Sequence, residues 1–515
     1  MTANLPSQSL CFAPDHPDAR YLRLEPPSSP IGYTAQHTHN EGLVINNFVM
    51  ADDGSKWLRK ATDVERFFEI AHQKQIHLIH YTLDLASARP LDEGFFRKAL
   101  THLYWKVPVL RVCLRERDSE LWLLEMEKCN IDLKIIVDRI LEDEQDKLTL
   151  HTYNSNDGPL WCVRILPLER TSQSLEDIQK EFPHHYALIF GIHHSVSDGT
   201  TNVKICNLLC NIMNDLLGGL VIDDNDQLGE ITSDVEVLEL YDEELVRLKE
   251  NPELCAEIKR ELEGAKVRPL IRHVCKVPAD VPVMTKSVTA LFNSEISNRF
   301  YMKAKSKGVS LHSALATLIN LSFVKILQEH GINQDEYNFR TGHDINIRRY
   351  FSSENSSRSL GINVPLFGYR SQSVVPNDLL PIFWETAKQF NEKFQADLSS
   401  RKVLTYSAYR IMNGNINQNF KEILKADGDP DYYYTISNMG NLSGVLYEED
   451  QNISLKKLTR FCSLRNGTSF LCIFIHTFRS QLNLTFAYST QFLTREFVRR
   501  LVELFELHLP LVCEV

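Results

Sequence analysis

Two adjacent histidines are the most chemically informative residues in the sequence. His193 and His194 lie in FGIHHSVSDGTT (190–201), where a strand-like apolar run ends in the pair and Asp198 and Gly199 follow after a short polar turn. Imidazole titrates near neutral pH, so it can take a proton from a hydroxyl or an amine. Because neighbouring side chains of a strand point to opposite faces, only one imidazole can face a given cleft, and the other must pack or hydrogen-bond as support. The pattern predicts a general base at a strand end.

The residues after the pair predict a turn that opens a helix. Apolar residues recur at three- and four-residue steps over 205–217, before Gly218 and Gly219, and this spacing indicates a helix that ends at the glycines. Asp198 could order the turn or pair with an arginine. Gly199 lets the backbone pass where a side chain would collide.

Two other chemistries fit the same residues less well. A metal site formed by His193, His194 and Asp198 is disfavoured, because side chains on opposite faces of a strand cannot both bind one ion without distortion. A serine nucleophile at Ser195 or Ser197 is disfavoured as well, because the GxSxG pattern is absent. We therefore predict no metal site here.

The surrounding patterns predict a mixed α/β architecture. Strands are expected at 76–86, 161–170 and 185–194, a helix at 91–107 that Pro108 stops, and a hairpin that turns at Asp118 and Ser119. In the second half, 309–331 predicts a helix capped by Ser310, and 493–509 predicts a closing helix that Pro510 ends. Strands and helices that alternate in this way are typical of an α/β fold.

The length of 515 residues favours two lobes with separate cores. Changes in composition divide the chain into four parts. They are a loosely ordered leader (1–40), an N-terminal lobe that carries the histidine pair (41–219), an acidic interlobe connection with exposed helices (220–287) and a C-terminal lobe (288–515).

Composition also excludes some classes of protein. With 43% hydrophobic and 24% charged residues, the chain is typical of globular proteins, and its net charge of −11 disfavours a general nucleic-acid partner. We expect no secretory signal and no transmembrane segment, because no apolar run has the required length or flanks. The 11 cysteines contain no CxxC pair and are expected to be reduced. These features together predict a cytoplasmic protein.

Several other polar and aromatic residues are expected to be structural. The earlier pair His184-His185 lacks a following Asp-Gly and is expected to face a loop. His312 is expected to pack on a helix face. The run 432–434 is expected to fill a lobe interface.

The full pattern HHxxxDG (193–199) resembles the signature of condensation domains, alcohol acetyltransferases and related CoA-dependent acyltransferases. Further segments are similar to that superfamily: the helix and turn at 91–111, the helix at 309–331, INIRRYF with SLGINVPL, and TISNMG. The resemblance covers the chain from about Ile76 to its C-terminus. It implies two lobes similar to chloramphenicol acetyltransferase, with mixed sheets flanked by helices and a tunnel between the lobes.

The resemblance also implies a role for each matching residue. His194 would be the catalytic base, supported by His193, Gly199 and an ion pair between Asp198 and Arg348. Possible tunnel residues are Ser437 and Asn438. No cofactor would be bound permanently, and acyl-CoA is the expected co-substrate for transfer to a hydroxyl or an amine.

Two alternatives stay open within the same fold. A condensation enzyme would take its acyl group from a carrier protein and form an amide or an ester. A member without catalysis would use the tunnel to bind a ligand or a partner.

Overall fold

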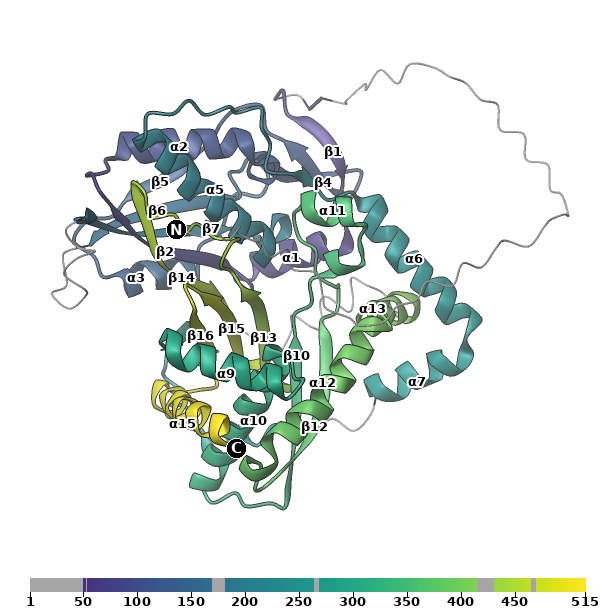
Figure 1. Ribbon diagram of the computed structural model, residues 1–515. Helices are drawn as coiled ribbons and strands as arrows, with labels where there is room; N and C mark the ends of the chain where they lie inside the picture. The colour runs from purple at the N-terminus through teal and green to yellow at the C-terminus, as the bar shows by residue number, and fades with distance from the viewer. Residues whose placement is uncertain (1–49, 52, 169–180, 264–267, 415–429, 465–468) are drawn as a thin grey trace, which may run out of the picture. The chain divides into compact units, whose positions relative to one another are not determined.

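Two mixed β-sheets, each with its own helices, organise the chain in the computed structural model (Figure 1). The structure describes residues 50–51, 53–168, 181–263, 268–414, 430–464 and 469–515, which belong to one compact unit from Phe48 to Val515. The leader expected over 1–40 lies outside the described residues. The two sheets have separate hydrophobic cores, which confirms the predicted α/β fold with two lobes.

The N-terminal lobe is built on a five-stranded sheet. In sheet order its strands are β14 (Ile453–Cys462), β2 (Ile79–Ser87), β7 (His184–Ile192), β6 (Trp161–Leu168) and β5 (Asp132–Ile135). Leu188, Phe190 and Ile192 of β7 belong to the core that includes α2 (Glu93–Lys106) and α5 (Gly199–Leu217). Ala187 and Ile189 pack instead with α3 (Leu141–Leu148). Because helices cover both faces, β7 is apolar at successive positions rather than at alternate ones.

A hairpin and a helix complete this lobe. The hairpin strands β3 (Val112–Arg117) and β4 (Glu120–Glu125) pair, and β1 (Lys56–Lys60) joins them. Asp118 and Ser119 have φ angles of 53° and 63°, which confirms the predicted tight turn. Helix α1 (Asp63–Gln73) begins with a capping box between Thr62 and Glu65.

The C-terminal lobe is built on a six-stranded sheet. In sheet order its strands are β12 (Tyr369–Pro376), β10 (Glu336–His343), β13 (Tyr432–Asn441), β15 (Ser469–Phe478), β16 (Gln481–Ser489) and β9 (Thr285–Leu291). The helices that contribute to its core are α9 (Ser294–Ser306), α10 (Leu311–Glu329), α12 (Phe383–Ser399) and α15 (Arg495–Glu514). Ser310 caps α10 as predicted, and its side chain accepts a hydrogen bond from the Ser313 amide. Among the described helices, α10 alone is long and apolar enough to cross a membrane, but 78% of the apolar window is buried inside the protein, as in the core helix of a lobe.

One local prediction is wrong. Helix α15 continues through Pro510 to Glu514, because Leu509 and Val512 are buried in the lobe core and Trp384 Nε1 donates a hydrogen bond to the Val512 carbonyl at 2.8 Å. This packing compensates for the amide hydrogen bond that proline cannot make. The pair His184-His185 is half-buried in the first two positions of β7, close to the start of the strand expected from His185.

Two strand pairings connect parts of the chain that are distant in sequence. β14 lies between β13 and β15 in the sequence, but it pairs antiparallel with β2 in the sheet of the N-terminal lobe. β8 (Glu230–Ile231) pairs in parallel with β11 (Ser359–Leu360). The predicted ranges assign β14 to the C-terminal lobe and so do not include its position in the N-terminal sheet.

The acidic segment between the lobes contains α6 (Asp234–Glu250), α7 (Pro252–Glu263) and α8 (Ile271–Val274). Val237, Leu240 and Tyr241 of α6 are buried against α13 (Lys402–Asn413). The remaining short helices are η1 (Pro108–Arg111), η2 (His194–Val196), η3 (Ile347–Tyr350), α11 (Ser353–Arg358) and η4 (Leu380–Ile382).

Candidate active site

The end of β7 presents the two histidines in different directions. The strand ends at Ile192, and the His193 amide still donates to the Leu160 carbonyl at 2.8 Å. His194 then begins the single turn η2, and α5 starts at Gly199. The two rings contact different residues of α1, as their opposite orientation predicts.

The His193 ring is buried, and each of its nitrogens has a polar neighbour. Its Nδ1 accepts a hydrogen bond from the Ser195 amide at 3.1 Å, and its Nε2 lies 3.0 Å from Glu69 Oε2. An Nδ1 that accepts from an amide leaves the proton on Nε2, so Nε2 is the donor to Glu69. Glu69 Oε1 accepts from Gln73, and Oε2 accepts from Ser155. Burial raises the pKa of Glu69, but the interaction with His193 and the hydrogen bonds from Gln73 and Ser155 lower it to about 2. The carboxylate therefore stays charged and holds the ring in place.

Glu69, His72 and His193 have the ligand types and proximity of a metal site, with ligand atoms within 4.8 Å of one another. Their hydrogen bonds do not fit a metal ion. His72 Nε2 accepts from the Tyr153 amide at 2.9 Å, and His193 Nδ1 accepts in the same way. Each ring therefore carries a proton on its other nitrogen, and metal binding there would require loss of that proton to give an imidazolate. The cluster is better explained as a hydrogen-bonded support for the strand end.

A second group of the same kind consists of Asp132, His151 and Cys162. Arg164 holds the Asp132 carboxylate with two hydrogen bonds of 2.8 and 2.9 Å. Burial raises the pKa of Cys162 to about 11, so the thiolate that a metal requires is unfavourable at neutral pH.

The His194 ring has one nitrogen committed to a hydrogen bond. Its Nδ1 lies 2.9 Å from the Ser197 carbonyl oxygen. Because a carbonyl can only accept, Nδ1 carries the proton and Nε2 has a lone pair. The ring is half-buried and stacks on Phe68 with a centroid distance of 4.1 Å, and the His77 ring lies edge-on at 6.5 Å. Burial lowers the pKa of His194 below its ordinary value of 6.5, so the imidazole is neutral at pH 7 and can accept a proton at Nε2.

Asp198 and Arg348 form the ion pair that the resemblance implies. Asp198 Oδ2 and Arg348 Nη1 are 2.6 Å apart, and both side chains are almost fully buried. Asp198 also caps α5 by accepting from the Thr201 amide at 2.9 Å, and it accepts from the Asn363 amide at 2.9 Å. Burial alone would raise the pKa of Asp198, but Arg348 and these two amides lower it below its usual range. The carboxylate therefore stays charged.

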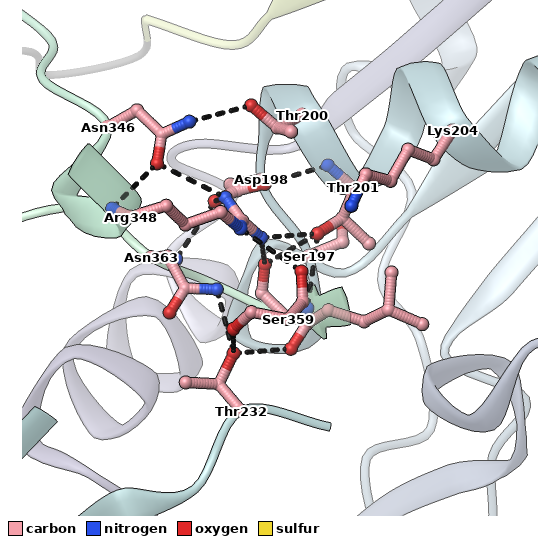
Figure 2. A network of polar contacts seen from close by, with 12 residues as sticks. Ser197, Asp198, Thr200, Thr201, Lys204, Thr232, Asn346, Arg348, Ser359 and Asn363 are labelled. Atoms are coloured by element: carbon pink, nitrogen blue, oxygen red, sulfur yellow. Dashed lines mark hydrogen bonds and ion pairs between the residues drawn. The ribbon is translucent and has the colours of Figure 1, made fainter. Parts of the chain in front are cut away.

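The rest of the Arg348 guanidinium is also satisfied (Figure 2). Its Nε donates to the Ser359 carbonyl at 3.1 Å, and its Nη2 donates to Thr201 Oγ1 at 2.9 Å. Arg348 belongs to η3, far from the motif in sequence, so this network joins the start of α5 to residues 346–363. We refer to the Asp198–Arg348 pair and these partners as the buried brace.

Gly199 leaves room for a residue from the C-terminal lobe. A Cβ at this position would lie 2.7 Å from Met439 Sδ and 3.7 Å from the Tyr81 hydroxyl. Met439 belongs to β13, so the end of β13 lies beside the start of α5. The absence of a side chain at Gly199 permits this close approach.

Ser437 and Asn438 lie on the same stretch of β13 as Met439. The Ser437 carbonyl accepts from Arg460 Nη2 at 2.8 Å, and Asn438 Oδ1 accepts from the Gly440 amide at 2.8 Å. Both residues are half-buried. They therefore lie near the motif glycine through β13, and their role in a tunnel stays a prediction.

The sequence did not single out the residues of α1 and its following turn that surround the histidines. Phe68 supports the His194 ring, Glu69 and His72 support His193, and His77 lies beside His194. Glu69 and His72 are three residues apart on one helix, and this Glu-x-x-His spacing is the only local signal that could have identified them.

Comparison with known proteins supports the fold. No protein-family model matches the chain, and no curated protein sequence does. Solved structures match over nearly the whole chain. The TRI3 trichothecene 15-O-acetyltransferase from Fusarium sporotrichioides has a TM-score of 0.65 at 12% identity, and the match covers 89% of this chain and 95% of that one.

Two condensation domains are similar to a comparable degree. The condensation domain of the Monacolin K polyketide synthase MokA has a TM-score of 0.58 at 11% identity, covering 89% of this chain and 98% of its own. The starter condensation domain of rhizomide synthetase RzmA, in complex with C8-CoA, has a TM-score of 0.54 at 13% identity, covering 89% and 95%. The chain therefore has the two-lobed fold of condensation domains and of this acetyltransferase. At these identities the likeness establishes the fold alone.

Proposed function

We propose that the chain transfers an acyl group from a thioester donor to a hydroxyl or amine acceptor, with His194 as the general base. The observation that carries the proposal is the geometry of one ring. His194 Nδ1 is held by the Ser197 carbonyl at 2.9 Å, and burial keeps the imidazole neutral with a lone pair on Nε2. A neutral imidazole of this tautomer is suited to remove a proton from a bound acceptor.

The proposed reaction has two steps and needs no acyl-enzyme. The acceptor transfers its proton to His194 Nε2 while its oxygen or nitrogen forms a bond to the thioester carbonyl carbon. The resulting tetrahedral intermediate then breaks its carbon–sulfur bond. The sulfur leaves as a thiolate and takes the proton from Nε2, which returns His194 to its starting state.

The support around the ring explains why the base would be effective. The buried brace fixes the start of α5, and the Glu69–His193 hydrogen bond fixes the strand end that precedes His194. A base held in one orientation does not have to be ordered during the reaction. General acid–base catalysis of this kind contributes about 10²- to 10⁴-fold to a rate.

Acyl-CoA is the donor that we favour. A mutant condensation domain with the same fold has been solved in complex with C8-CoA. A carrier protein that bears the same thioester is the alternative donor. In either case we propose that donor and acceptor meet at His194 through a tunnel between the lobes, with Ser437 and Asn438 on its wall.

The proposal is tested by thiol release. The full chain would be incubated with a panel of acyl-CoAs and of acyl groups loaded on a carrier protein, each with alcohol and amine acceptors. We expect thiol release that depends on the acceptor and is accompanied by an ester or amide product. Release from CoA but not from the carrier would identify the donor as CoA, and the reverse result would identify a condensation enzyme.

Silence across all donors and acceptors would contradict the proposal and favour a ligand-binding role for the fold. The cytoplasmic location, the lack of a nucleic-acid partner and the lack of a permanently bound cofactor stay predictions.

A further inference from the structure

Three arginines from separate elements gather around two aromatic rings in the C-terminal lobe. Arg340 of β10 and Arg370 of β12 lie over the Tyr432 ring, with guanidinium carbons 4.9 and 4.4 Å from its centroid. Arg410 of α13 lies over the Phe367 ring at 4.7 Å. Stacking leaves the edges of a guanidinium, which carry its hydrogen-bond donors, directed away from the ring.

These half-buried arginines lack the carboxylate partners that two fully buried arginines have. Arg164 and Arg348 each hold a carboxylate at 2.8 Å or less. For Arg340, Arg370 and Arg410, no carboxylate lies within ion-pair distance among the residues that the structure describes. Arg340 Nη1 is buried without a hydrogen-bond partner in the same part of the chain. A buried donor without a partner is costly, so Arg340 Nη1 is available to an anion, and the half-exposed guanidinium groups of Arg370 and Arg410 lie beside it.

Neighbouring titratable groups neutralise the cluster only in part. Burial raises the pKa of Asp344 to about 6, against the opposing charges of Arg370 and Arg460, so at pH 7 this carboxylate is mostly charged and offsets part of the charge of Arg370 from beyond ion-pair distance. Burial lowers the pKa of His77 to about 3, with His194 and Arg370 adding to the effect, so His77 is neutral. Burial lowers the pKa of Arg410, and the charge of Arg370 lowers it further, as expected for like charges close together.

The cluster is connected to His194 through two side chains, His77 and Phe68. Arg370 is close enough to His77 to affect its titration, and the His77 ring is 6.5 Å from that of His194. Phe367, under Arg410, belongs to the apolar cluster that contains Phe67, and Phe68 packs against that cluster. Phe68 in turn stacks on His194. His77 and Phe68 therefore connect the arginine cluster to the proposed base.

Gly342 leaves space for the Arg370 guanidinium. A Cβ at this position would lie 2.6 Å from Arg370 Nη1 and 2.6 Å from Thr435 Oγ1. The missing side chain lets the Arg370 guanidinium fold over the backbone of β10. This position offers a way to displace the guanidinium without removing a charge.

We propose that Arg340, Arg370 and Arg410 bind an anionic group, a carboxylate or a phosphate, of one of the two substrates that react at His194. Guanidinium groups bind both kinds of anion through paired hydrogen bonds. The assignment of the anion to a substrate rests on the proposed acyl transfer, whereas the anion site itself does not. A carboxylate would belong to an acidic acceptor, and a phosphate would belong to the donor or to a phosphorylated acceptor.

The test is calorimetric titration of the full chain at fixed ionic strength. Three probes are used: malonate for a carboxylate, inorganic pyrophosphate for a phosphate, and adenosine 3′,5′-bisphosphate for the phosphates of CoA. We expect at least one probe to bind the wild type and to bind about tenfold or more weakly to Arg370→Gln and Arg410→Gln. Preference for malonate identifies an acidic acceptor. Preference for the bisphosphate or for pyrophosphate identifies a phosphate, which belongs to the donor if CoA displaces the probe and to a phosphorylated acceptor if CoA does not.

Three further variants make the result specific. Arg97→Gln removes an exposed arginine that pairs with Glu93 on α2, and it should bind the probe as the wild type does. Gly342→Ala keeps every charge and should weaken binding. His194→Ala should bind the probe unchanged, so loss of acyl transfer and loss of the anion site are separate outcomes. The proposal is overturned if no probe binds the wild type, or if Arg370→Gln and Arg410→Gln bind as tightly as the wild type.

Discussion

Replacement of Arg348 by methionine should reveal how much the buried brace contributes to stability. The substitution keeps most of the side-chain length but leaves the Asp198 carboxylate without its ion-pair partner. Removal of one partner from a buried pair costs about 3–5 kcal/mol, because an uncompensated charge stays in the interior. Asp198 still accepts from the amides of Thr201 and Asn363, so we expect Arg348→Met to lower the free energy of unfolding by about 3 kcal/mol, the low end of that range.

A second variant separates the charge from the geometry. Asp198→Asn removes the charge and keeps an oxygen that can cap α5, and the Ser359 carbonyl and Thr201 hydroxyl still accept from Arg348. We expect a loss of about 1.5–3 kcal/mol. The double variant should lose less than the sum of the two single losses, because each single change already breaks the shared interaction.

The assay is urea unfolding of the full chain, with an exposed ion pair as the control. Arg500 and Glu329 are 2.6 Å apart at the surface, and an exposed pair of this kind contributes at most about 1 kcal/mol. Arg500→Met should therefore change stability little. The reasoning is refuted if Arg348→Met loses no more stability than Arg500→Met, or if the double variant loses the full sum.

Three further predictions concern titration and positioning. The rate of acyl transfer should fall as pH decreases through a midpoint below 6.5, because burial lowers the pKa of His194 and only the neutral ring is a base; a midpoint above 7 in the pH–rate profile would contradict this. His80 is buried, stacks on Phe461 at 4.8 Å, has no hydrogen-bond partner on either ring nitrogen among the described residues, and has a pKa that burial lowers to about 3. The stability that depends on the neutral ring is present above pH 6.5 and is lost as pH falls toward 3, by about 2 kcal/mol between pH 7 and 5. The free energy of unfolding of His80→Phe should therefore fall by that much less than the wild type over this pH range. An unchanged pH dependence of unfolding would count against the buried neutral ring. Glu69→Leu should lower kcat about ten- to hundredfold by releasing His193, and Glu69→Gln, which can still accept from His193, should retain most of the rate; equal losses in both variants would argue against a positioning role.

Local patterns predicted the elements that carry the motif. The apolar spacing over 205–217 and the glycines after it gave the limits of α5, and the turn at Asp118 and Ser119 follows from residues that tolerate a positive φ. Each of these signals lies within one element, and the distant contacts at these two places do not oppose it.

The sequence could not predict interactions that depend on distant segments. Glu69 contacts His193 across more than 100 positions, and β14 pairs with β2 across more than 350. Helix α15 passes Pro510 because tertiary packing outweighs a local stop signal. The Asp198–Arg348 pair is an exception, because the resemblance, and not any local pattern, indicated it.

The most direct test of the central claim is the rate of acyl transfer by His194→Ala, measured beside His184→Ala as a matched control from the other end of β7. If His194 is the base, its variant should be about 10²- to 10⁴-fold slower with a melting temperature close to that of the wild type, and His184→Ala should keep the full rate. Undiminished transfer by His194→Ala would contradict the account.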